Sequence, residues 1–459
     1  MRNAVSGHRR PQFEVASEGQ LSRQDLNSVN VPAHLRALRA QSISFWLCAL
    51  YLVFEYVRPQ TIYPWLDFIP WTQSALLGSL AAFLLEKQSR WQSSTQSKLL
   101  VLYLLTVAAS ILLGYDPAAG WANFDLIGSW LLVHLMIVNV TTTRTRFALL
   151  FLLFLLASFK MSQHGFLSWA RRGFQFANWG VTGSPGWFHN SGEFGIQLAV
   201  FIPLSVTFLA AFWRHWNWVK RLFFLAMPVT AVGALIATSS RASQLACLIV
   251  AIYLGLSASK SRMKAALALV AVLAVVWNFM PATQLNRIAA IGTDATSVQR
   301  LVYWRHGLDM LSSHPLLGVG YFSWIPYYAD HWPEDVPYQG VEMPHNIFVQ
   351  AAAETGLLGF GLYVAMIVYC FAMQSSIRRH SVAAKDRETE LLSRGLDGAL
   401  IGFLISASFV SVLYYPYFWI HAALATCLYN VVRREALGAD CAKRGLTGRP
   451  RGRSVRTGS

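Results

Sequence analysis

Long runs of apolar residues constrain this chain more than any other feature of its sequence. About twelve such runs, each near the roughly 20 residues that a helix needs to cross a bilayer, are spread along the chain. They lie near residues 42–57, 69–85, 99–114, 121–140, 147–161, 193–212, 222–238, 242–258, 264–280, 346–373, 396–413 and 415–432. Strands of a membrane barrel would show short alternating segments instead. With 54% hydrophobic and 13% charged residues, the sequence predicts an all-α, polytopic membrane protein of about twelve transmembrane helices.

Basic residues predict the orientation, because lysine and arginine are retained on the cytoplasmic side of a membrane. Most of them fall in segments that share one side if both termini are cytoplasmic: 1–41, 86–98, 141–147, 213–221, 259–264, 374–394 and 433–459. We therefore expect a cytoplasmic tail over 1–41, a transmembrane domain over 42–432 and a basic cytoplasmic tail over 433–459. The net charge of +16 then faces anionic membrane lipids, and no nucleic-acid partner is required.

Two long connections are expected on the outer side, residues 162–192 and residues 281–345, the second between the ninth and tenth helices. In the second, apolar residues at helical spacing (Leu301, Trp304, Leu308 and Leu311) precede a His-Pro pair and a glycine-rich turn. This pattern predicts a surface helix on the membrane, followed by a tight loop. Residues 326–344 are expected to be irregular. The acids between Asp330 and Asp335 are expected to be solvated.

His345 stands directly before the tenth apolar run. A helix turns about 100° per residue, so Ala352, Gly356 and either Gly359 or Phe360 would lie beneath His345, and the small residues would let another helix approach closely. Glu354 would lie about 180° away and is not expected to orient the histidine directly. For Glu354 a structural polar contact and a direct role both stay open, since a carboxylate so deep should face protein or water.

Three groups on the outer side could form one site: Arg241, Arg300 or Arg305, and His345. Taken singly, such an arginine is usually a headgroup contact and such a histidine a hydrogen-bonded surface group. Guanidinium groups recognise phosphate in a bidentate manner, and histidine can take a proton near neutral pH. Together they indicate a site that holds a phosphate-bearing lipid and deprotonates an acceptor.

Four motifs in this part of the chain resemble those of the bacterial O-antigen ligase and polymerase family. His345-Asn346, nine residues and then Gly356-x-x-Gly359 match its His-Asn/Ser/Gln motif. Arg300-x-x-x-Trp304, HPLLGVG at 314–320 and TSSRAS around Arg241 are similar to its other signatures. The resemblance covers roughly residues 238–373. FHNSGEFG at 188–195 departs from the family's commoner Asn-x-x-Phe-Ala pattern, so Asn190 and Glu193 receive no catalytic role, although Glu193 is a candidate for lining an acceptor groove.

The resemblance implies a polytopic glycosyltransferase of the bacterial inner membrane whose donor is a glycan on undecaprenyl pyrophosphate. It implies that Arg241 and Arg300 bind the donor pyrophosphate and that His345 acts as the base on the acceptor hydroxyl, on the periplasmic face. Arg305 follows closely on the same expected helix, so which arginine is primary stays open, and Asn346 is a further substrate-binding candidate. No Asp-x-Asp stands in the outer loops, and neither a metal nor a cofactor is expected.

These motifs are shared by several activities. Our first choice is a ligase that transfers finished polysaccharide to a lipid A core sugar. A polymerase would use a second lipid-linked glycan as acceptor, and a protein O-oligosaccharyltransferase would modify periplasmic proteins. A transporter, which belongs to a different class, would show ionisable residues near the midplane of several spans, and few are found here.

Overall fold

The computed structural model describes residues 19–87, 89–176, 180–258, 295–336 and 340–443. Within these ranges every regular element is a helix and no strand occurs, which confirms the all-α prediction for the described residues. The α-helices are α1 (Arg23–Ser28), α2 (Val31–Arg39), α3 (Ile43–Tyr56), α4 (Pro59–Ile62), α5 (Trp71–Leu85), α6 (Thr95–Leu112), α7 (Pro117–Ala122), α8 (Phe124–Val140), α9 (Arg144–Arg171), α10 (Ser191–Phe212), α11 (Trp218–Ala237), α12 (Arg241–Ala258), α15 (Ala295–Ser313), α16 (Trp324–His331), α17 (Ile347–Ala384), α18 (Arg387–Ala407) and α19 (Pro416–Lys443). Short 3-10 turns are η1 (Pro64–Leu66), η2 (Trp213–His215) and η3 (Pro333–Asp335).

Several of these helices are long and apolar enough to cross a membrane. Among the described residues five meet this test: α6, α9, α10 together with η2, α11 and α17. The pair α2 and α3, bent by 119°, would make a sixth if it is one span, and α5, α8 and α12 are shorter apolar helices. The expected ninth span, 264–280, lies outside the described residues. The chain is therefore a multi-span membrane protein, whereas the count of about twelve spans stays a prediction.

Three expected boundaries were wrong. The expected loop 162–192 begins later, because α9 continues to Arg171; polar side chains lower the hydropathy of a window but do not end a helix. The expected span 396–413 is α18, which ends at Ala407 and is followed by a turn of residues 408–415. Residues 326–344 are not wholly irregular, since α16 covers Trp324–His331 and buries aromatic rings between α15 and α17.

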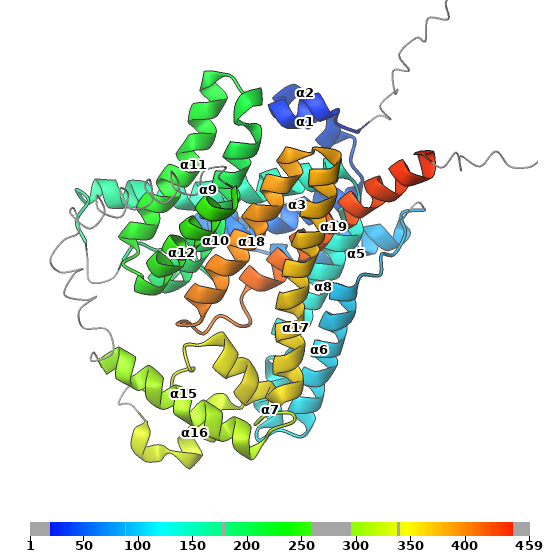
Figure 1. Ribbon diagram of the computed structural model, residues 1–459. Helices are drawn as coiled ribbons and strands as arrows, with labels where there is room; N and C mark the ends of the chain where they lie inside the picture. The colour runs from blue at the N-terminus through cyan, green and yellow to red at the C-terminus, as the bar shows by residue number, and fades with distance from the viewer. Residues whose placement is uncertain (1–18, 88, 177–179, 259–294, 337–339, 444–459) are drawn as a thin grey trace, which may run out of the picture.

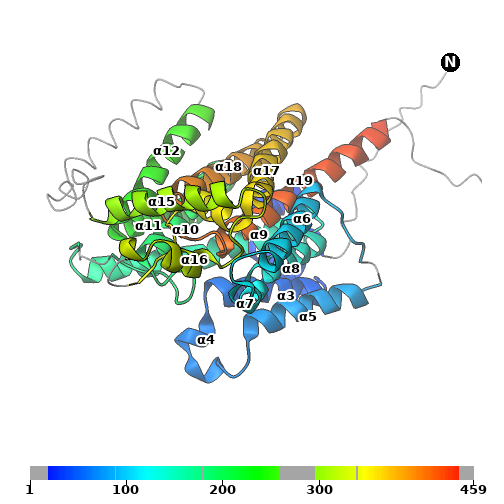
Figure 2. The same ribbon diagram turned by 90° about the horizontal axis from the view of Figure 1, so that it is seen from below.

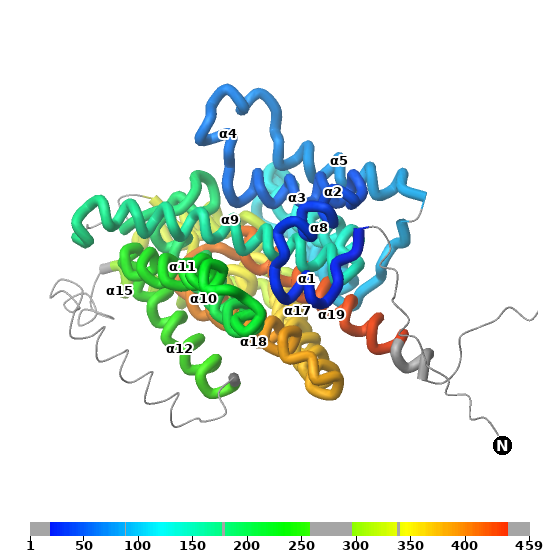
Figure 3. Tube along the Cα trace, turned by 90° about the horizontal axis from the view of Figure 1, so that it is seen from above, coloured from blue at the N-terminus to red at the C-terminus, as the bar shows by residue number. Residues whose placement is uncertain are grey.

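The two ends of the helical bundle differ in what covers them. Figure 1 shows α1, α2 and the junction of α17 with α18 at one end, and α7, α15 and α16 at the other. Seen from below, α15 and α16 lie across that second end (Figure 2). Seen from above, the segment around α4 projects from the body of the molecule (Figure 3), and it exposes Trp65 and Phe68. Which end faces the cytoplasm stays a prediction.

Arg144 ties three helices together at the end that carries α1. Its guanidinium donates to both carboxylate oxygens of Glu435 on α19, from Nε at 2.9 Å and from Nη2 at 2.6 Å. Its Nη1 lies 3.1 Å from Asp386, directly before α18. Burial of Asp386 opposes its ionisation, but Arg144, Thr389 and Arg23 outweigh this and lower its pKa. The starts of α9 and α18 and the end of α19 thus share one end, as the charge pattern requires.

α17 is broken at Gly356, near the centre of the expected motif. Gly356 has φ 63° and ψ −170°, a conformation that is essentially restricted to glycine. Residues 347–355 therefore form a separate helical arm, which Figure 1 shows running at an angle to the long remainder of α17. The expected stack of Ala352, Gly356 and Gly359 on one continuous helix is wrong, because the turn per residue cannot be carried across the break.

The HPLLGVG turn at 314–320 satisfies the backbone groups that the break releases. Val319 N donates to Ala353 O at 2.8 Å, and Leu357 N donates to Pro315 O at 2.8 Å. The two chains approach so closely that a Cβ on Gly356 would overlap the backbone of Leu316. The small residue at 356 therefore admits a turn rather than a neighbouring helix.

Replacing Gly356 by alanine should lower the free energy of unfolding by about 1–3 kcal/mol, because an alanine is strained in this backbone conformation. The overlap of its Cβ with Leu316 should add to this loss. The matched control is Gly361→Ala on the same helix, where an added Cβ meets nothing within 4 Å. The two variants are solubilised in detergent and heated, and the fraction that remains folded at each temperature is measured by size-exclusion chromatography. Equal midpoints for G356A and G361A would contradict this account of the break.

Candidate functional site

The segment before α17 is fixed by the helices that cover this end of the bundle. Glu342 N donates to the Tyr303 hydroxyl at 3.1 Å, and Trp324 Nε1 donates to Glu342 O at 3.0 Å. Trp304 Nε1 donates to Pro344 O at 2.9 Å. Tyr303 and Trp304 belong to α15 and Trp324 to α16. The expected helix thus exists as α15, and its aromatic residues hold the chain immediately before His345, whereas its position on the membrane surface stays a prediction.

His345 follows this segment with a left-handed φ of 51°. Its backbone N donates to Ser411 Oγ at 2.8 Å, in the turn between α18 and α19. Its ring Nε2 lies 3.1 Å from Glu342 Oε2, and the side chain is 30% exposed. The carboxylate has no proton to donate when ionised, so Nε2 carries the hydrogen and Nδ1 is left as the basic nitrogen. A partly exposed imidazole that is oriented by a carboxylate is suited to accept a proton from a substrate.

Glu342 is the residue at this site that sequence reasoning missed. It stands three residues before His345, but nothing in the sequence pattern points to a contact between the two side chains. The expectation that Glu354 does not orient the histidine agrees with the contacts, since Glu354 accepts from Tyr414 and Gln350 instead. The acids Asp330 and Asp335 are exposed as expected, but they also accept hydrogen bonds, from Tyr115 and His306 respectively. The bond to Asp330 raises the pKa of Tyr115.

Asn346 has a structural task that explains why an amide follows the histidine. Its side-chain oxygen accepts from Phe348 N at 2.9 Å and from Val349 N at 3.3 Å, so Asn346 caps the first turn of α17. The cap stabilises the start of the arm that carries His345. A substrate contact by Asn346 stays a prediction.

Arg241 is the first residue of α12, and the start of α10 connects its surroundings to those of His345. A Cβ placed on Gly195 of α10 would lie 2.6 Å from Ser243 Oγ, two residues beyond Arg241. A Cβ on Gly192, one turn earlier on α10, would lie 3.8 Å from Val410 Cγ2, next to Ser411. The helix that begins with Arg241 and the turn that binds His345 N therefore lie beside the same end of α10.

Asn190 and Glu193 close that end of α10. Asn190 is the N-cap and forms a capping box with Glu193, whose carboxylate also lies 3.5 Å from His189 Nδ1. Glu193 is 7% exposed, which limits what it can offer to a substrate. These contacts are structural, as expected for Asn190, and the acceptor-groove hypothesis for Glu193 stays a prediction.

Arg300 and Arg305 point in different directions from α15. Arg305 is five positions after Arg300, so their side chains are about 140° apart around the helix. Arg300 is half-buried and is separated by four residues from Trp304, which bonds the chain before His345. Arg305 is exposed and shares its face with Leu301 and Leu308, which are also exposed. The geometry therefore favours Arg300 over Arg305 as a member of the site.

No cluster of three or more metal-binding side chains occurs in the described parts of the chain. Metal-independent chemistry stays a prediction.

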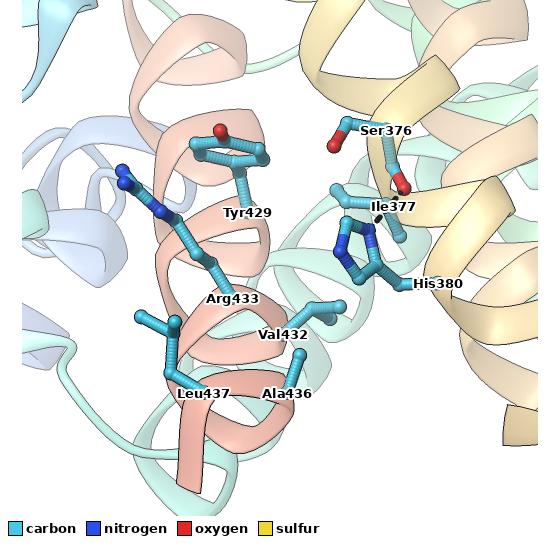
Figure 4. Close-up of a pocket in the computed structure, with 8 residues that line it drawn as sticks. All are labelled: Ser376, Ile377, His380, Tyr429, Val432, Arg433, Ala436 and Leu437. Atoms are coloured by element: carbon cyan, nitrogen blue, oxygen red, sulfur yellow. Dashed lines mark hydrogen bonds between the residues drawn. The ribbon is translucent and has the colours of Figure 1, made fainter. Parts of the chain in front are cut away.

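A groove between α17 and α19 is lined by Ser376, Ile377, His380, Tyr429, Val432, Arg433, Ala436 and Leu437 (Figure 4). It includes none of the expected site residues and lies toward the far end of α17 from His345.

Comparison with known proteins assigns the part of the chain that holds the site. Residues 226–364 match the family model described as O-antigen ligase. The described helices indicate a multi-span membrane protein, and one region of it matches the O-antigen ligase family model, which confirms the resemblance seen in the motifs. The matched range contains all the expected site residues: Arg241, Arg300, Arg305, His345 and Asn346.

A curated relative is similar over part of the same chain. Over 121 residues the sequence is 31% identical to the exopolysaccharide production protein ExoQ of Rhizobium meliloti (strain 1021). The alignment covers 25% of this chain and 26% of the relative, so this chain spans about a quarter of the length of the relative it matches.

Trp304→Phe should lower the free energy of unfolding by at least about 1 kcal/mol, because it leaves the carbonyl of the buried Pro344 without its donor. Trp65→Phe is the control, since Trp65 is 74% exposed. The thermal midpoints of the purified variants in one detergent give the comparison. If W304F unfolds at the same temperature as W65F, the hydrogen bond does not hold this segment.

Proposed function

We propose that this protein is a metal-independent membrane glycosyltransferase that moves a polysaccharide from undecaprenyl pyrophosphate to a hydroxyl of the lipid A core on the periplasmic face. The observation that carries the proposal is the His345–Glu342 pair, presented by a hydrogen-bonded segment inside the O-antigen ligase family region. Such a pair supplies a base at a fixed position, which a transfer to an unactivated hydroxyl requires. The family match supports the substrate class, a lipid-linked polysaccharide.

The transfer then proceeds in one displacement. His345 Nδ1 takes the proton of the acceptor hydroxyl, and that oxygen forms a bond to the anomeric carbon of the donor glycan. The bond between that carbon and the pyrophosphate oxygen breaks, undecaprenyl pyrophosphate leaves with the electron pair, and the anomeric configuration inverts. Arg241 and Arg300 stabilise the charge that develops on the pyrophosphate, a task for which guanidinium groups suffice.

A second candidate differs only in the acceptor. The relative from Rhizobium meliloti is named for exopolysaccharide production, which favours a polymerase that extends one lipid-linked glycan with another. The same base and the same arginines would serve, because the bond that breaks is identical. Deleting the gene in its host separates the two candidates. Lipid A core without glycan, beside accumulated long lipid-linked chains, supports the ligase. Core with a single repeat, or loss of a secreted polysaccharide with normal lipopolysaccharide, supports the polymerase.

His345→Ala should leave the protein in the membrane and reduce glycan transfer by about 10²–10⁴-fold, the usual contribution of a general base. Complementation of the deletion strain, with lipopolysaccharide gels and membrane immunoblots, measures both quantities. Normal transfer by H345A, at equal protein level, would remove His345 as the base.

Arg241→Ala and Arg300→Ala should mainly raise the donor concentration needed for half-maximal rate, and lysine should restore only part of the activity if the contacts are bidentate. Arg305→Ala is the matched control on the same helix, because Arg305 faces the exposed side. Donor titrations in membrane vesicles distinguish the variants. A larger defect in R305A than in R300A would reverse the assignment of the two arginines.

A further inference from the structure

The arm of α17 that follows His345, residues 347–355, is bonded at both of its ends to one turn. At the first end His345 N donates to Ser411 Oγ at 2.8 Å. At the other end the Tyr414 hydroxyl donates to Glu354 Oε2 at 2.6 Å. Ser411 and Tyr414 both belong to the turn of residues 408–415 between α18 and α19. One attachment point, His345, lies directly before the arm, and the other, Glu354, lies near its end, so the arm is held at both ends.

Glu354 is held in a position that is unfavourable for a carboxylate. It is completely buried, and the backbone N–H groups of Trp324 and Phe322 also donate to the carboxylate. Gln350 Nε2 also donates to Oε2, at 3.3 Å, but Gln350 lies on the arm itself. Burying a polar group without full hydrogen bonding costs free energy. The bond to Tyr414 is the side-chain contact by which this carboxylate joins the arm to the turn between α18 and α19.

Tyr414 is a firm anchor. Its backbone carbonyl accepts from Trp130 Nε1 of α8 at 2.8 Å. Its ring stacks on Phe322 with centroids 5.7 Å apart and meets the edge of Tyr321 at 4.9 Å. Both rings follow directly after the HPLLGVG turn that closes the break at Gly356. An arm bonded to Tyr414 is thereby placed relative to the bundle and to the turn at once.

The arm needs such a contact because Gly356 separates it from the rigid part of α17. In a continuous helix the long segment would orient His345, but the break removes that constraint. We infer that Glu354 is a positioning residue for His345: its bond to Tyr414 fixes the arm, and the arm fixes the imidazole relative to the bound donor. This inference rests on the proposed role of His345 as the base.

The experiment compares E354A, E354Q and Y414F with the wild-type full chain reconstituted in vesicles. The donor is the lipid-linked glycan extracted from the deletion strain, and the acceptor is lipopolysaccharide from the same strain. E354A and Y414F should lower kcat by about tenfold or more with an unchanged KM for donor, because a misplaced base affects the reaction step and not donor binding. E354Q should retain most of the rate, since its amide oxygen can still accept from Tyr414. The double variant E354A/Y414F should be no worse than E354A.

Tyr363→Phe is the matched control. Tyr363 is a buried tyrosine on α17. The substitution removes only a hydroxyl, as Y414F does, and the hydroxyl of Tyr363 has no partner among the described residues. Hydrogen–deuterium exchange supplies a readout that does not depend on transfer. Exchange over residues 342–355 should rise in E354A and Y414F and stay at the wild-type level in Y363F.

The outcomes separate the two claims. Faster exchange in both E354A and Y414F, together with a selective loss of kcat, supports the positioning role. Unchanged exchange, unchanged kcat, or a rise in KM with constant kcat overturns it. If H345A retains transfer, the proposed base is wrong, while the exchange measurement still decides whether Glu354 and Tyr414 hold the arm.

Discussion

The hydrogen bonds that close the break in α17 determine the arrangement around the site. A helix interrupted inside a membrane protein exposes backbone groups that must find partners within the protein. Here Val319 N and Pro315 O, both from the HPLLGVG turn, supply two of them. The turn is thereby held against α17, and α16 follows directly after it. Because α15 ends where the turn begins, the cover of this end of the bundle depends on the same contact.

The residues of the family motifs divide into those that shape the backbone and those that are available for chemistry. Gly356 permits the break, Asn346 caps the arm, and Trp304 holds the carbonyl before His345. A sequence pattern alone cannot separate these tasks, because a glycine required by the backbone and a histidine required for chemistry both appear in it simply as motif residues. The contacts separate them: among these motif residues, His345 presents a basic nitrogen on a partly exposed side chain.

The apolar runs predicted most helices, because the length and hydropathy of a span are local properties of the sequence. What they could not predict depends on distant partners. In the sequence, Gly356 lies among small residues and resembles a site of close helix packing. In the structure the backbone of the HPLLGVG turn lies against Gly356, where the helix breaks. Ser411 and Tyr414 lie far along the chain from the residues they bind. The sequence alone could have favoured Arg300 over Arg305. Arg300 and Trp304 are four positions apart, and residues at this spacing lie on the same face of a helix.

Two carboxylates serve the same arm in different ways, and their exposure explains the division. Glu342 is 54% exposed beside His345, so water screens the pair, and ion pairs exposed to this degree usually contribute about 0–1 kcal/mol. Glu354 is buried and contacts no part of the imidazole, but it joins the arm to Tyr414. A displacement of about 1 Å at a reacting group can lower a rate by about 10²-fold, which exceeds what a screened ion pair supplies. On the proposal that His345 is the base, we therefore expect the larger contribution from the distant carboxylate, through position, and the smaller one from the carboxylate that touches the imidazole.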